Sequence, residues 1–100
     1  MPDTPTPASF LPQRDPRVVD ELLADGSMLV FQTASRTLMT LNPTAALVWE
    51  YCDGLHTPEA IAAEVRAIFP EVNAVTNDTA AIINNLRVAG MLRPPAREVL

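Results

Sequence analysis

His56 and Cys52 are the side chains of this chain best suited to catalysis, since a histidine can act as a general base and a cysteine as a nucleophile. A histidine base needs an orienting acid, and the nearby Asp53 is interpreted as a solvated loop residue. Cys52 ends an apolar segment, where a lone cysteine is typically a small buried hydrophobic residue. The sequence therefore predicts a structural role for both.

Motifs for metal or phosphate chemistry are not found in the sequence. No CxxC, HxxxH or paired-carboxylate spacing occurs, and there is no glycine-rich phosphate loop. Trp49 lies in an apolar segment and is interpreted as a core anchor. We therefore expect a protein that is not an enzyme and that uses no metal and no cofactor.

The charge pattern argues against nucleic acid as a partner. The net charge is −5, and no two of the seven basic residues are adjacent. All of them are arginines, and they lie at Arg14, Arg17, Arg36, Arg66, Arg87, Arg93 and Arg97. A nucleic-acid-binding surface requires clustered positive charge. We therefore expect no nucleic acid, and DNA binding is kept as an alternative only because the fold below permits it.

The location of the protein is inferred from what the sequence lacks. It has no run of about 18 apolar residues that could cross a bilayer. The first residues carry neither the basic nor the apolar region of a secretory signal. The single cysteine cannot form an internal disulfide. We expect a cytoplasmic protein with no membrane association.

The positions of the prolines divide the chain. Five of the ten prolines fall within the first 16 residues, a segment with neither helical nor strand periodicity. We predict a disordered proline-rich arm at residues 1–16, one folded domain at 17–93, and a tail at 94–100 that follows a double proline. With 48% hydrophobic residues, the domain has enough apolar side chains for one small core.

Three strands are predicted first. Residues 18–23 mix apolar and acidic side chains, residues 28–32 form a continuous apolar run typical of a strand buried on both faces, and residues 37–41 combine threonine with aliphatic side chains. Asp25-Gly26 predicts a two-residue hairpin between the first two strands. Residues 33–36 predict a polar turn, which completes an antiparallel meander.

Three helices are predicted to follow. Asn42-Pro43 and Thr57-Pro58 each place a capping side chain before a proline at the first helical position. The first helix should end near Cys52 with Gly54 as its left-handed terminator, and the second should stop at Pro70. The third should open at Asn77-Asp78, bury Thr79, Ile82, Ile83, Leu86 and Ala89, and end at Gly90. The expected fold is α+β and winged-helix-like, a three-stranded antiparallel sheet followed by three helices.

The third strand has the features of a peptide-binding edge. Residues 37–41 form an outer strand of the meander without lysine, proline or any charge, although such devices normally protect an edge from foreign strands. An open edge of this kind can accept a guest strand by β-augmentation. Two alternatives are that the proline-rich arm covers the edge, or that a second copy of the chain pairs with it in a homodimer.

The third helix carries a second stripe beside its core stripe. Asp78, Ala81, Asn85 and Val88 recur at helical spacing, and the amide of Asn85 can both donate and accept hydrogen bonds. If this stripe lines a cleft next to the third strand, a peptide could pair with the strand and pack on the helix. The other interpretation is an ordinary solvated face.

Two blocks of sequence resemble a known family. The run from Leu41 to Gly54, LNPTAALVWEYCDG, resembles the "LN-x-T/S-A … W-E-x-C-D-G" signature of the PqqD family. Residues 57–65 and 78–92 are similar to two further helical segments of that family, so the likeness covers roughly residues 18–92. Asn42, Pro43, Trp49, Asp53 and Gly54 match the signature, and we assign them folding roles as helix cap, first helical residue, core anchor, loop residue and helix terminator.

The resemblance implies a function. PqqD-like domains are recognition elements that bind the leader of a ribosomally made precursor peptide and present it to a modifying enzyme, often a radical SAM protein, or to a peptidase or cyclase. The leader joins the sheet beside the third strand and packs on the third helix. The peptide-binding residues that this implies here are Leu38, Met39, Thr40 and Leu41 on the strand, with Ala81, Ile82, Asn85 and Val88 on the helix.

Overall fold

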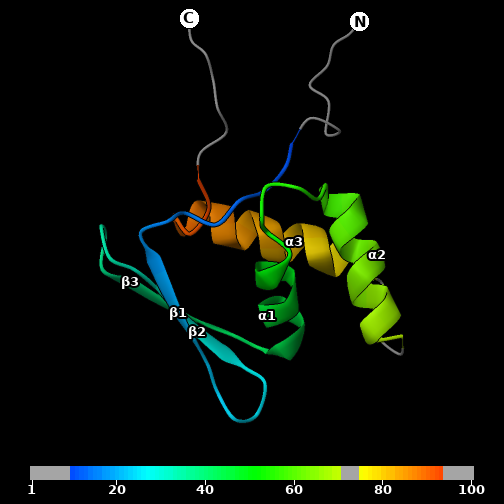
Figure 1. Cartoon of the computed structure of the whole chain (residues 1–100), viewed down its shortest axis with the longest axis horizontal. Coiled ribbons are helices and arrows are strands. Elements are labelled where there is room, and N and C mark those ends of the chain that lie inside the picture. The colour runs from blue at the N-terminus through cyan, green and yellow to red at the C-terminus, as the bar shows by residue number, and fades with distance from the viewer. Residues whose placement is uncertain (1–9, 71–74, 94–100) are drawn as a thin grey trace, which may run out of the picture.

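The computed structural model describes residues 10–70 and 75–93, with the backbone alone at 75–77. Three strands, β1 (Val18–Leu22), β2 (Met28–Gln32) and β3 (Thr37–Leu41), precede three helices, α1 (Pro43–Glu50), α2 (Pro58–Ile68) and α3 (Val75–Val88). Figure 1 shows the strands gathered on one side of the molecule and the helices on the other. The predicted α+β order of a three-stranded antiparallel sheet followed by three helices is confirmed.

The sheet is a meander with β2 in the centre, and β1 pairs with β2 in the register Leu22 to Met28. The predicted two-residue hairpin at Asp25-Gly26 is wrong. The N–H of Leu23 donates to the carbonyl of Ser27 at 2.8 Å, and the N–H of Gly26 donates to the carbonyl of Leu23 at 3.0 Å. The loop therefore has one residue more, and Gly26 takes the left-handed position (φ +91°) that a three-residue hairpin requires.

Strand β2 has one buried and one partly exposed face, so the prediction of burial on both faces is wrong. Met28, Val30 and Gln32 are buried, whereas Leu29 and Phe31 between them are only half-buried. The helices cover one face of the sheet, and alternate side chains of a strand point to opposite faces. An apolar run alone does not reveal that the second face lacks a cover.

Local capping signals set the starts of the first two helices, as predicted. The side chain of Asn42 accepts a hydrogen bond from the N–H of Ala45 at 2.8 Å, and that of Thr57 accepts one from the N–H of Ala60 at 3.1 Å. Helix α1 ends at Glu50, earlier than expected. Gly54 is not its terminator, because the N–H of Gly54 donates to the carbonyl of Pro12 instead.

Helix α3 begins at Val75, before the predicted Asn77-Asp78 start, and the proposed cap of Asn77 lies outside the side chains that the structure describes. Its end matches the prediction at Gly90 (φ +81°). The N–H of Met91 donates to the carbonyl of Leu86 at 2.9 Å, and the N–H of Gly90 donates to that of Arg87 at 3.1 Å. This pair of bonds is a Schellman motif, and it folds the buried Met91 back against the helix end.

The core lies where the helices meet the inner face of the sheet. Trp49 is 1% exposed, which confirms it as a core residue, and its indole N–H donates to Asp20 Oδ2 at 2.8 Å. Thr79, Ile83 and Leu86 of α3 are buried as predicted. Ile82 and Ala89 of the same predicted stripe are only partly buried and pack at the border of the core.

Residues 10–16 are not a disordered arm. Gln13 forms an isolated bridge with Asp53, and Arg14 forms one with Leu92. Pro12 is fully buried, and the guanidinium of Arg14 donates to the carbonyls of Trp49 and Glu50 at 2.9 and 2.7 Å. These contacts join positions far apart in the sequence, so local periodicity could not predict them. Residues 1–9 and the tail at 94–100 lie outside the described residues.

Within residues 10–70 and 75–93, no helix combines the length and the apolar character needed to cross a bilayer.

Candidate functional site

A groove of about 200 Å³ lies between strand β3 and helix α3, and the start of α1 closes one side of it. Its walls consist of apolar side chains with a few neutral polar groups. The lining residues are Met39, Thr40, Leu41, Asn42, Ala45, Ile82, Asn85 and Leu86. None of them carries a charge, so the groove favours an apolar guest.

The hydrogen bonds of β2 determine which side of β3 is free. The N–H of Leu23 donates to the carbonyl of Ser27, and the N–H of Thr33 donates to the carbonyl of Arg17 at 3.1 Å. Main-chain groups of an antiparallel strand alternate between its two neighbours. The odd-numbered residues of β2 therefore bond to β1, and the even-numbered residues bond to β3.

It follows that Leu38 and Thr40 present their main-chain N–H and C=O groups at the free edge of β3. Thr37, Met39 and Leu41 lie opposite the even-numbered residues of β2 and bond to them. Among residues 10–70 and 75–93, β3 pairs with no strand other than β2. The segment at 10–16, which could have covered this edge, lies instead beside residues 52–54 and 91–93.

The structure brings together some of the predicted binding residues and separates others. Met39, Thr40, Leu41, Ile82 and Asn85 line one groove, and Ile82 both lines it and packs against the core. The remaining three predicted residues are exposed and do not line it, namely Leu38 (62% exposed), Ala81 and Val88 (74% exposed).

The sequence analysis missed three lining residues, Asn42, Ala45 and Leu86. Leu86 is one helical turn beyond Ile82, so the helical period could have identified it. Asn42 and Ala45 directly follow β3, and chain continuity could have placed them at the end of the groove. The carboxamide of Asn42 is already used, because its oxygen caps α1 through the N–H of Ala45. Asn85 is thus the amide available to a guest.

Asp53 is not the solvated loop acid that the sequence suggested. Its Oδ1 lies 2.9 Å from His56 Nδ1 and accepts a hydrogen bond from the N–H of Leu55 at 2.9 Å. These contacts, chiefly the one with His56, lower the pKa of the Asp53 carboxyl. The imidazole also meets the ring of Tyr51 edge to face, with 5.3 Å between the ring centroids. The contacts of Asp53 and His56 thus stabilise the loop between α1 and α2.

Cys52 is fully buried, and burial raises the pKa of its thiol to about 12. A thiol with this pKa carries almost no thiolate at neutral pH, so it is a poor nucleophile. The interpretation of Cys52 as a structural residue agrees with this burial. Among the residues that the structure describes, no three His, Cys, Asp or Glu side chains are grouped closely enough to hold a metal ion.

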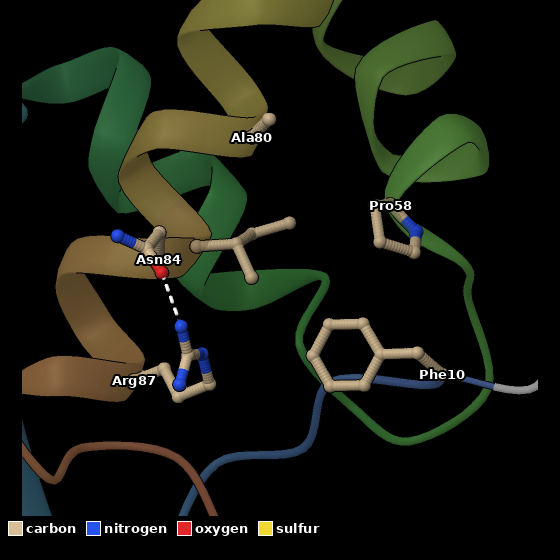
Figure 2. A pocket seen from close by; sticks show the side chains of 6 residues that line it. Phe10, Pro58, Ala80, Asn84 and Arg87 are labelled. Carbon is tan, nitrogen blue, oxygen red and sulfur yellow. Dashed lines mark hydrogen bonds between the residues drawn. The ribbon is translucent and has the colours of Figure 1, made fainter. Parts of the chain in front are cut away.

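A second cavity of about 220 Å³ lies on the other flank of α3 (Figure 2). Phe10 and Pro58 form one wall, and Ala80, Asn84 and Arg87 of α3 form the other. The guanidinium of Arg87 donates to the side-chain oxygen of Asn84. None of the residues that line this cavity belongs to β3 or to the groove.

Comparison with known proteins agrees with this architecture. Two solved structures share the fold. The first, TbiB1 in complex with the TbiA(beta) leader peptide, is 19% identical with a TM-score of 0.67 and covers 85% of this chain and 99% of its own. The second, lasso peptide synthetase B1 complexed with the leader peptide, is 24% identical with a TM-score of 0.68 and covers 85% of this chain and 100% of its own.

A comparison with curated proteins gives no match. The family model described as coenzyme PQQ synthesis protein D (PqqD) matches residues 27–92, which include the whole groove and the free edge of β3. This match spans well over half of the sequence, and the chain therefore belongs to the PqqD family.

Proposed function

We propose that this protein binds the leader segment of a ribosomally synthesised precursor peptide and presents it to a modifying enzyme. The observation that carries the proposal is the free edge of β3 directly beside an uncharged groove. A guest strand can bond to the main-chain groups of Leu38 and Thr40 while its alternate side chains pack against Ile82 and Asn85. Membership of the PqqD family and the leader peptides present in both similar structures support this function.

The expected affinity follows from simple terms. Leu38 and Thr40 offer two donors and two acceptors, and each hydrogen bond contributes about 1 kcal/mol net. Apolar side chains buried in the groove add about 25 cal/mol per Å². After the cost of ordering the peptide, a dissociation constant of roughly micromolar or below is expected.

The proposed role is binding, not catalysis. The modifying chemistry belongs to the partner, which by family resemblance is a radical SAM protein or a peptidase or cyclase. The buried thiol of Cys52 and the structural contacts of His56 support this division of labour. A lone reduced cysteine also suits the cytoplasm, which is the compartment we propose.

DNA binding by this α+β fold is a weaker candidate. Arg14 bonds to the end of α1, Arg17 is paired with Asp15 at 2.7 Å, and Arg87 bonds to Asn84. These three of the seven arginines thus have partners within the fold, and a net charge of −5 disfavours contact with phosphates. Pairing of β3 with a second copy remains the other alternative, and it would compete with a peptide for the same edge.

Titration of the isotope-labelled protein with a synthetic leader, taken from a precursor encoded beside its gene, tests the proposal. In NMR spectra, we expect the leader to change the backbone amide chemical shifts along β3 and the groove side of α3. A duplex DNA of random sequence should change none of these chemical shifts at low salt. If DNA shifts the arginine-bearing segments and the leader shifts nothing, the ranking of the two functions is reversed.

A further inference from the structure

The outer face of the sheet, opposite the helices, carries an apolar row that crosses all three strands. Val19 pairs with Phe31, and Phe31 pairs with Leu38, so the three side chains are direct cross-strand neighbours. Val19 is 57% exposed and Leu38 is 62% exposed, with Phe31 half-buried between them. This outer row ends at Leu38, on the free edge of β3.

The next row along the strands differs in character. Glu21 pairs with Leu29, and Leu29 pairs with Thr40, so this row ends at the same edge with a hydroxyl. The side chains of Met39 and Leu41 alternate with those of Leu38 and Thr40 and therefore face the groove, whereas Thr40 borders the groove at the strand edge and has its side chain on the outer face. The free edge thus shows a guest two different surfaces at once, the groove on one face and the outer row on the other.

A guest strand must place its successive side chains on the same two faces, because the side-chain period of a strand is two residues. The guest residue beside Leu38 cannot reach the groove and must lie on the outer face. Leu38, exposed at the end of the outer row, gains a cover from that residue. The guest residue beside Thr40, one row further, also lies on the outer face. A β-branched or hydroxyl side chain is favoured there, because such side chains pair well with threonine across strands.

We propose that the leader is selected on both faces of the sheet, and that Leu38 is a specificity residue for the outward-facing side. This inference rests on the proposed function and adds a defined substrate class. The preferred segment has apolar residues beside Leu38, Met39 and Leu41 and a β-branched or hydroxyl residue beside Thr40. The guest residues beside Met39 and Leu41 face the groove. The guest residue beside Leu38 is also apolar, although it lies on the outer face.

Selection from a messenger-RNA-displayed library of random peptides tests this without knowledge of the natural precursor. Full-length wild-type protein and the Thr40→Pro variant serve as bait and counter-bait, so that enriched peptides depend on the strand edge. One enriched peptide is then substituted with serine at each position in turn. Affinities for the wild type and for Leu38→Thr are measured by calorimetry, with Val19→Thr at the far end of the outer row as the matched control.

We expect one peptide position at which serine weakens binding to the wild type and to Val19→Thr by about three- to fivefold but does not weaken binding to Leu38→Thr. The flanking positions should lose affinity equally for all three proteins, because they face the groove. If peptides that require the Thr40 N–H show no position coupled to Leu38, the inference is wrong and the proposed function stands. If no peptide distinguishes the wild type from Thr40→Pro, both are wrong.

Discussion

The indole N–H of Trp49 donates to the carboxylate of Asp20 at 2.8 Å, and this bond joins α1 to β1, the strand at the opposite edge of the sheet from β3. The guanidinium of Arg14 lies over the indole ring, 5.9 Å from the ring centroid. Helix α1 also follows β3 directly and supplies Ala45 to the groove. The bond from Trp49 thus ties β1 to α1, the helix that follows β3 and closes the site.

Replacing Asp20 with alanine should lower the free energy of unfolding by about 1–2 kcal/mol, because the buried indole N–H loses its acceptor. Urea unfolding followed by tryptophan fluorescence measures the change. Glu21→Ala is the control, since Glu21 is an exposed neighbour on the outer face of the sheet. Equal stabilities for the two variants would mean that the bond contributes nothing.

The Thr40→Pro variant should abolish leader binding and leave the domain folded. Proline removes one of the outward donors at the free edge, while the bonds of β3 to β2 come from the residues on either side. Calorimetry measures binding, and circular dichroism checks the fold. Thr40→Val keeps the N–H and should retain binding within a few fold. Unchanged affinity of the folded proline variant would contradict edge pairing.

A tryptophan at position 85 should block the groove. Asn85 is exposed on α3 yet lines the groove, so Asn85→Trp can place a large ring there without disturbing the core. We expect at least a tenfold loss of leader affinity. Asn84→Trp is the matched control, because Asn84 is also exposed but lines the cavity on the other flank of α3. Similar losses for both variants would place the leader elsewhere.

The Asp15–Arg17 pair should make stability depend on pH in the acid range. Asp15 is 4% exposed and accepts hydrogen bonds from the guanidinium and N–H of Arg17, which lower its pKa from 3.8 to about 2. A carboxyl whose pKa is lower in the folded state stabilises the fold above its unfolded pKa, and this contribution is lost as the pH falls toward the folded pKa.

The free energy of unfolding of the Asp15→Asn variant should therefore be about 2 kcal/mol lower than that of the wild type at pH 7. The difference should shrink below about pH 4 and become small near pH 2, where about half of the wild-type carboxyls are protonated in the folded state. Urea titrations at several pH values measure it. A gap of the same size at pH 7 and pH 2 would show that the charge of Asp15 is not its cause.

Elements with local signals could be predicted from the sequence. The bounds of β2 and β3 match the prediction, and the caps Asn42 and Thr57 act as expected because a cap bonds within its own first turn. The segment at 10–16 was misjudged for the opposite reason. Its partners lie at residues 52–54 and 91–93, and no local pattern signals a contact over such a separation.

The residues of the candidate site could likewise be predicted only where a local period places them. Strand alternation places Met39 and Leu41 on the groove side, and the helical period places Ile82 and Asn85 opposite them. The orientation of α3 relative to β3 depends on core packing, so the sequence could not show that Ala81 and Val88 lie outside the groove. Whether these residues contact a leader stays a prediction.

The bridge between Arg14 and Leu92 has a consequence for protein engineering and for gene fusion. Near the two ends of the described residues the chain lies side by side, as the N–H of Asp15 donating to the carbonyl of Met91 at 2.9 Å also shows. A larger protein could therefore carry it as an insert between two adjacent surface residues of its own, with no long connector on either side.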